Sequence, residues 1–114
     1  MTVIKFRKEF YQQIRDGVKT QTLRTPQHRL EVVPGDFAAC VFPGIKEQLF
    51  VTITDVGYKY FKTLNDENAR LEGFSSVNEL KKVLLDIYPT LDNYNRLYYY
   101  RFRLDGYAET VKED

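Results

Sequence analysis

The sequence predicts an α+β domain in which a small mixed or antiparallel sheet, able to close into a β-barrel, is flanked by helices. Helical and strand patterns follow one another in the order helix, strands, helices, final strand, and no internal repeat interrupts them. The chain has 114 residues, of which 43% are hydrophobic, so one core burying about two thirds of the unfolded surface is expected. We therefore assign residues 1–105 to one domain and residues 106–114 to a polar, frayed C-terminal tail.

Charge and composition exclude several classes of protein. The chain carries 17 basic and 16 acidic side chains, for a net charge of +1, which excludes a globally basic nucleic-acid-binding surface but allows a local patch. With one His and one Cys there is no ligand set for zinc, so we expect neither a metal nor a cofactor, and Cys40 is predicted to be a buried thiol. No signal-peptide pattern and no apolar run of about 18 residues occurs, which predicts a soluble, cytoplasmic protein without a membrane partner; a monomer is the favoured assembly.

The first elements surround a polar segment at residues 17–24. Residues 3–6 predict a short strand and residues 8–16 a short amphipathic helix that ends at Gly17. The following Thr-Gln-Thr-Leu-Arg has β-type composition, which places Lys19 at a helix-to-strand junction. On a regular strand Thr20, Thr22 and Arg24 share one polar face, as a functional site or an exposed edge strand would.

The middle of the chain predicts a β-hairpin. Residues 37–42 form an apolar run bounded by Pro-Gly signals, and residues 49–54 form a second one. Gly57 predicts a bulge or bend, after which Tyr58 and Tyr60 extend the strand.

Two helices and a last strand complete the pattern. Residues 65–71 predict a helix capped at Asn65 or Asp66, with Glu72 in its last turn and Gly73 just beyond. Residues 76–79 match a capping box that opens a second helix, which stops at Tyr88-Pro89. Residues 97–104 alternate as a strand whose outer face carries Tyr99 between basic side chains; this face either stacks single-stranded nucleic acid or is an ordinary half-exposed sheet face.

These segments, taken together, resemble an ASCH domain of the PUA-like superfamily. The resemblance covers nearly the whole chain and rests on residues 10–24, the turn at residues 34–36, the helix end at residues 72–74, the helix around residues 79–82 and the stop at residues 88–89. The general ASCH pattern is Gly-x-Lys-x-x-Glu-x-Arg, whereas this chain has Thr22 at the Glu position. That departure is similar to the small ASCH branch that hydrolyses N(4)-acetylcytidine.

The resemblance implies a catalytic set of Lys19, Thr22 and Glu72. Amide hydrolysis by a hydroxyl needs a base, an acid for the leaving amine and donors for the oxyanion. Our hypothesis is that Thr22 is the nucleophile, Lys19 its base and Glu72 the proton carrier, with Glu72 alternatively orienting water. The predicted substrate-binding residues are Thr20, Arg24, Arg29 and Tyr99, and the predicted partner is a nucleoside or RNA.

Two physical conditions must hold for this hypothesis. The pKa of Lys19 must fall by about three units from that of a free lysine, although a neighbouring carboxylate raises it. Lys19 and Thr22 also lie on opposite faces of an ideal strand, so the junction must be irregular at Lys19 or Thr20. Lys19, Thr22 and Glu72 must then converge on one cleft.

Two other functions fit the same sequence. The first is a non-catalytic module that binds RNA or a modified nucleoside, with Arg24, Arg29 and Tyr99 as contacts. The second is a ribonuclease, for which His28 would serve as the acid or base.

Overall fold

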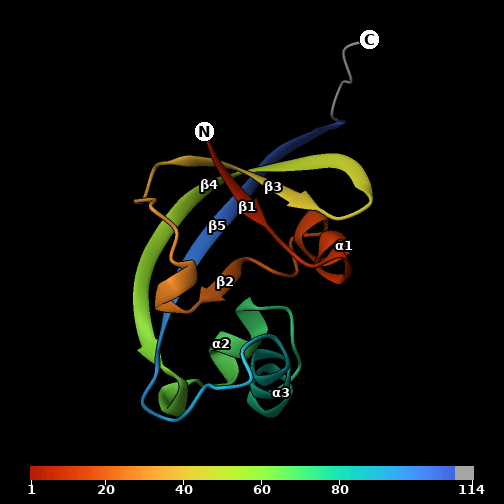
Figure 1. Ribbon diagram of the computed structural model, residues 1–114. Coiled ribbons are helices and arrows are strands. Elements are labelled where there is room, and N and C mark those ends of the chain that lie inside the picture. Colours follow the sequence, from red (N-terminus) through yellow and green to blue (C-terminus); the bar gives the residue numbers. More distant parts are fainter. Residues whose placement is uncertain (110–114) are drawn as a thin grey trace.

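The computed structural model describes residues 1–109 and contains one mixed sheet of five strands that curves into a half-barrel (Figure 1). The strand order is β1-β3-β4-β5-β2. Strand β1 runs parallel to β3, and the other neighbours are antiparallel. The strands are β1 Thr2–Lys5, β2 Gln21–Arg24, β3 Phe37–Phe42, β4 Ile45–Tyr60 and β5 Arg96–Glu109. The predicted α+β class with a small barrel-like sheet is therefore confirmed.

Short helices connect the strands and cover one end of the sheet. The predicted helix at residues 8–16 is a 3₁₀ turn, η1 Lys8–Phe10, that continues into α1 Tyr11–Arg15. Two further 3₁₀ turns are η2 Pro26–His28 and η3 Phe61–Thr63. The helices α2 Asp66–Leu71 and α3 Val77–Ile87 begin at the predicted caps, because the side chains of Asn65 and Ser76 each accept a backbone N–H of the first turn.

The alternation along β5 divides the interior into two apolar clusters. Tyr100 and Phe102 belong to the larger cluster, which fills the curved face of the sheet under α1 and includes Cys40. Burial raises the pKa of the Cys40 thiol to about 12, as expected for an inert core thiol. Leu97, from the opposite face of β5, joins Leu23 and the apolar sides of α2 and α3 in the second cluster. Strand β2 is thus covered on both faces, although it is an edge strand.

Two predictions about the long strands were wrong. Strand β5 does not end at residue 105, because residues 106–109 remain paired with β4; the rest of the predicted tail, residues 110–114, lies outside the described residues. Gly57 is not a bulge: the register shifts occur at Phe50/Val51 and Ile53/Asp55, and Gly57 stays in register with Tyr99. A Cβ at Gly57 would lie 2.5 Å from the Tyr99 hydroxyl oxygen, so the position is a glycine because the Tyr99 ring covers it.

None of the helices in residues 1–109 has the length and apolar character needed to cross a membrane.

Candidate active site

Lys19 is placed by the way the chain leaves α1. Gly17 adopts φ +74°, the left-handed conformation that commonly ends a helix. The backbone carbonyl of Gln13 then accepts the N–H groups of Val18 and Lys19 at 2.9 and 3.0 Å. Strand β2 begins only at Gln21, so Lys19 lies in an irregular junction, as its pairing with Thr22 requires.

Glu72 reaches the same place from the end of α2. The N–H of Thr20 donates to the carbonyl of Leu71 at 2.8 Å, and Gln13 Nε2 donates to the carbonyl of Gly73 at 3.2 Å. Gly73 has φ +90°, and a Cβ there would lie 2.9 Å from Gln13 Oε1 and 3.4 Å from Lys19 Cβ. Only a glycine lets the two helix ends approach this closely without strain, and the approach sets Glu72 against Lys19.

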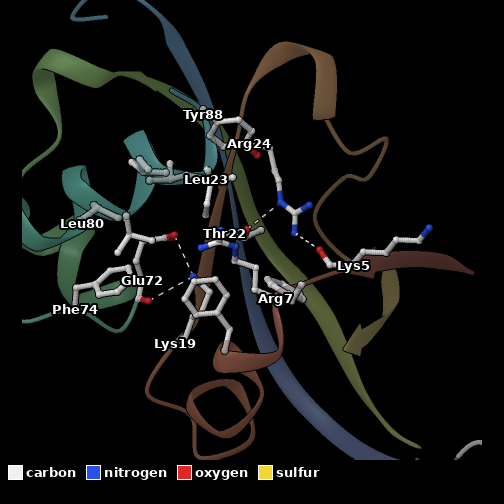
Figure 2. Close-up of a pocket in the computed structure, with 15 residues that line it drawn as sticks. Lys5, Arg7, Lys19, Thr22, Leu23, Arg24, Glu72, Phe74, Leu80 and Tyr88 are labelled. Atoms are coloured by element: carbon white, nitrogen blue, oxygen red, sulfur yellow. Dashed lines mark hydrogen bonds and ion pairs between the residues drawn. The ribbon is translucent and has the colours of Figure 1, made fainter. Parts of the chain in front are cut away.

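Lys19 and Glu72 form a buried ion pair (Figure 2). Lys19 Nζ donates to Glu72 Oε1 at 3.1 Å and to the Glu72 carbonyl at 3.4 Å, and it lies 4.8 Å from the centre of the Phe10 ring. The two side chains are only 3% and 4% exposed. Burial lowers the pKa of Lys19 although Glu72 raises it, and burial raises the pKa of Glu72 although Lys19 lowers it. Both groups therefore move toward their neutral forms, which suits them to exchange protons.

Arg24 holds the hydroxyl of Thr22 in the same cleft. Arg24 Nε donates to Thr22 Oγ1 at 3.1 Å, and Nη2 donates to the Lys5 carbonyl at 3.0 Å. The guanidinium group also lies 5.1 Å from the centre of the Phe6 ring. Because the Thr22 oxygen accepts from Arg24, its own proton is left for another acceptor. Within residues 1–109 no hydrogen bond joins Lys19 Nζ to Thr22 Oγ1, so proton transfer between them requires substrate or water to close the gap.

The cleft that these side chains line is polar on one wall and apolar on the other. Lys19, Thr22, Arg24 and Glu72 all contribute to its surface, as Figure 2 shows. The opposite wall is built by aromatic and aliphatic side chains, which are Phe6, Phe10, Phe74, Leu80, Val83, Leu84, Ile87 and Tyr88. An apolar wall facing a few convergent polar groups is typical of a small-molecule site.

Two buried polar atoms beside the ion pair lack a hydrogen-bond partner. Glu72 Oε2 and Gln21 Nε2 both lack one within the described part of the chain, and the Gln21 side chain nevertheless lowers the pKa of Glu72. Buried polar atoms are nearly always satisfied in native proteins, so an unpaired carboxylate oxygen in a cleft marks a place for a donor on a ligand or a water molecule.

The predicted substrate-binding residues are only partly brought together. Arg24 lies in the cleft, whereas Thr20, Arg29 and Tyr99 do not line it. Thr20 acts through its backbone, whose carbonyl accepts from the Phe102 N–H at 3.0 Å. Arg29 lies over the Tyr98 ring, and Tyr99 packs at the edge of the second apolar cluster. Strand alternation directs Tyr99 to the face opposite Tyr98, which is why the predicted contacts do not converge.

His28 lies outside the cleft. Its Nδ1 is 3.0 Å from Thr25 Oγ1, and its ring packs 5.6 Å from that of Tyr88. Within residues 1–109 no three His, Cys, Asp or Glu side chains gather in a way that could hold a metal ion.

Sequence reasoning missed several residues of the cleft. Gln13 links both helix ends, Gln21 is fully buried beside Glu72, and Phe10 covers the ammonium group of Lys19. The missed signal was the polar glutamine at position 21 in a strand whose neighbours are buried, because a buried amide must have a polar reason to be there.

Comparison with known proteins gives the fold. An ASCH domain from Lactobacillus crispatus JV V101 superimposes with a TM-score of 0.73 at 14% identity, over 82% of this chain and 68% of the other. A protein from Enterococcus faecalis V583 that carries the family label DUF984 has a TM-score of 0.73 at 14% identity, over 92% and 76% of the two chains. An ASCH protein from Zymomonas mobilis, crystallised as a Ser-to-Ala mutant, has a TM-score of 0.64 at 16% identity, over 89% and 66%.

The sequence matches no protein-family model and no curated protein. The half-barrel is thus the fold of ASCH domains, which confirms the resemblance at the level of the fold. A shared fold does not transfer an activity, so the function has to come from the cleft.

Proposed function

We propose that this protein is an amidohydrolase of the ASCH family that removes the acetyl group from N(4)-acetylcytidine or a related N-acylated nucleoside. The observation that carries the proposal is the buried Lys19–Glu72 pair, which shares one cleft with the hydroxyl of Thr22. A buried pair whose members both shift toward neutrality is costly to stability and is typical of sites that move protons.

In the first step Thr22 attacks the acyl carbonyl carbon. The Thr22 Oγ–carbon bond forms while the hydroxyl proton passes to the neutral amine of Lys19, whose lowered pKa makes that form accessible. The carbonyl oxygen becomes an oxyanion, and the guanidinium group of Arg24, already bonded to Thr22 Oγ1, is the nearest permanent cation to stabilise it.

Glu72 supplies the proton that the leaving amine needs. Because burial raises its pKa, Glu72 can hold a proton at Oε2, the oxygen that has no partner within residues 1–109. When the intermediate collapses, the carbon–nitrogen bond breaks, the departing nitrogen takes this proton, and the acetyl group remains as an ester on Thr22.

Water then completes the cycle. A water molecule attacks the ester and gives its proton to the Glu72 carboxylate, which restores the neutral acid. Thr22 leaves as the alkoxide and recovers its proton from the Lys19 ammonium, so acetic acid is released and all three groups return to their starting forms.

The walls of the cleft support a flat heterocyclic amide as the substrate. The rings of Phe10 and Phe74 meet edge to face at 6.3 Å on the side of the ion pair, and Tyr88 closes the other end. Aromatic walls favour a planar base, while the polar groups meet only its exocyclic acylated nitrogen. The ASCH fold and the Thr22 substitution in its motif favour the same substrate class.

The proposal is tested by incubating the protein with N(4)-acetylcytidine and measuring cytidine and acetate by chromatography. We expect turnover by the wild type and a loss of about a thousandfold or more in Lys19→Ala, Thr22→Ala and Glu72→Ala. Thr20→Ala is the matched control, because the Thr20 side chain does not line the cleft. Retained turnover in Thr22→Ala would exclude the acetyl-enzyme route. No turnover by the wild type, together with salt-sensitive RNA binding, would favour the non-catalytic module instead.

A further inference from the structure

A cluster of arginine and tyrosine side chains lies where β4 and β5 pair near η3. Tyr58 pairs with Tyr98, and Tyr60 pairs with Arg96, so these four side chains share one face of the sheet. The loop after η2 adds Arg29, whose guanidinium carbon lies 5.4 Å from the centre of the Tyr98 ring. We call this group the Arg–Tyr platform; it comprises Arg29, Tyr58, Tyr60, Arg96 and Tyr98.

The rings of the platform pack against one another and leave surface free. The centroids of Tyr58 and Tyr60 are 6.0 Å apart, and those of Tyr58 and Tyr98 are 6.3 Å apart. Arg96 lies 4.6 Å from the centre of the Tyr58 ring. Tyr58 is nevertheless 49% exposed and Tyr60 38% exposed, which is unusual for ring clusters of this size. Aromatic surface is therefore held in place and kept available.

The charges of the platform are not neutralised. Of the eight arginines, five form ion pairs with carboxylates; within residues 1–109 the three that do not are Arg24, Arg29 and Arg96. Glu31 and Asp92, the carboxylates in the walls of the adjoining grooves, are exposed and pair with neither platform arginine. Arg96 and then Arg29 hold the pKa of Tyr98 below its ordinary value, as a positive local potential does. A chain of net charge +1 thus concentrates unpaired guanidinium groups here.

The platform is continuous with the candidate active site. The cleft and the neighbouring groove share Ile87 and Tyr88, and that groove ends at Arg96. Across the strands, Arg24 of the cleft stands in register with Tyr98 on β5, which stands in register with Tyr58 on β4. Residues in register on adjacent strands point to the same face, so one row leads from the cleft to the platform.

We infer that the Arg–Tyr platform binds single-stranded nucleic acid, so that the base entering the cleft belongs to a strand whose neighbouring nucleotides lie along the platform. Exposed rings offer stacking surfaces to unpaired bases, and unpaired guanidinium groups meet their phosphates. A duplex hides its base faces, and an acidic protein has no use for them, so both fit this surface less well. The presentation of the base to the cleft rests on the proposed function, whereas strand binding does not.

The test measures the fluorescence anisotropy of a labelled oligocytidine of about ten nucleotides, as RNA and as DNA, against a duplex and an acidic peptide. We expect binding of the single strands that weakens about tenfold in Tyr58→Ala and in Arg96→Ala, with Arg96→Ala also lowering the salt dependence by about one unit of slope. Tyr107→Ala and Arg103→Ala are matched controls: Tyr107 is 53% exposed on the same strand as Arg96, and Arg103 is already paired with Asp105. The RNA and DNA arms decide whether the 2′-hydroxyl contributes.

The outcomes separate this inference from the proposed hydrolysis. Tyr58→Phe keeps the ring and should bind as the wild type does, which guards against a folding defect in Tyr58→Ala. If the wild type does not bind single strands, binds the duplex or the acidic peptide as tightly, or is weakened equally by the control variants, the platform is not a nucleic-acid site. Binding that depends on the platform without turnover of N(4)-acetylcytidine would overturn the hydrolysis alone; turnover without strand binding would overturn the platform alone.

Discussion

Two ion pairs flank α1 and have almost the same geometry but opposite electrostatics. Arg15 Nε lies 2.9 Å from Glu47 Oε1, and Lys19 Nζ lies 3.1 Å from Glu72 Oε1. The side chains of the first pair are 33% and 20% exposed, and those of the second are 3% and 4% exposed. Hydrogen bonds from Tyr11 and Arg15 lower the pKa of Glu47, whereas burial raises the pKa of Glu72. Burial, and not distance, decides the sign.

The comparison separates a structural ion pair from a reactive one. Water and the Tyr11 hydroxyl support the charged form of Glu47, so that pair gains from ionisation. In the cleft the cost of removing charge from water exceeds the attraction between the partners, and the Lys19–Glu72 pair is held together by the packing of α1 against α2. A protein keeps such a pair where its chemistry requires it.

The largest effect is expected when the buried pair is broken. Lys19→Met should abolish turnover and destabilise the fold by about 3 kcal/mol near pH 8, because Glu72 is left buried without its cation. Near pH 5 the loss should shrink, since Glu72 with its raised pKa takes up a proton and becomes neutral. Urea unfolding followed by circular dichroism at both pH values measures the difference. An equal loss at both would mean that Glu72 remains ionised in the fold.

Replacing both members of the buried pair should restore stability without activity. Lys19→Met combined with Glu72→Leu should be within about 1 kcal/mol of the wild type, or more stable, because no charge is left to desolvate. Turnover of N(4)-acetylcytidine should be absent. A double variant as unstable as the single one would show that the pair has a structural role which apolar packing does not replace.

The smallest effect, and the most direct contrast, concerns the two glutamates. Glu47→Gln should lose stability relative to the wild type as the pH rises from acid to neutral, because the lowered pKa of Glu47 means that its charged form stabilises the fold. Glu72→Gln should gain relative stability over the same rise, because the raised pKa of Glu72 means that the fold penalises its charged form. Chemical denaturation between about pH 4 and 8 gives both slopes, and parallel slopes would contradict the comparison.

Local pattern was sufficient for most elements of this fold. The caps at Asn65 and Ser76, the stop at Gly17 and the alternation through Tyr100 and Phe102 were all predicted, since each depends on a few neighbouring residues. The bulge at Gly57 and the end of the last strand at residue 105 were wrong, because the Tyr99 ring and the pairing with β4 come from a distant strand.

The candidate site divides along the same line. The sequence alone placed Lys19 in an irregular junction and brought Thr22, Arg24 and Glu72 into consideration, because a helix stop and a strand start are local events. It could not show that Gln13 joins the two helix ends or that Arg29 and Tyr99 lie away from the cleft. Nor could it give the pKa directions of Lys19 and Glu72, since desolvation depends on every group that excludes water from them. Residue types are written in the chain, but burial exists only once the chain has folded.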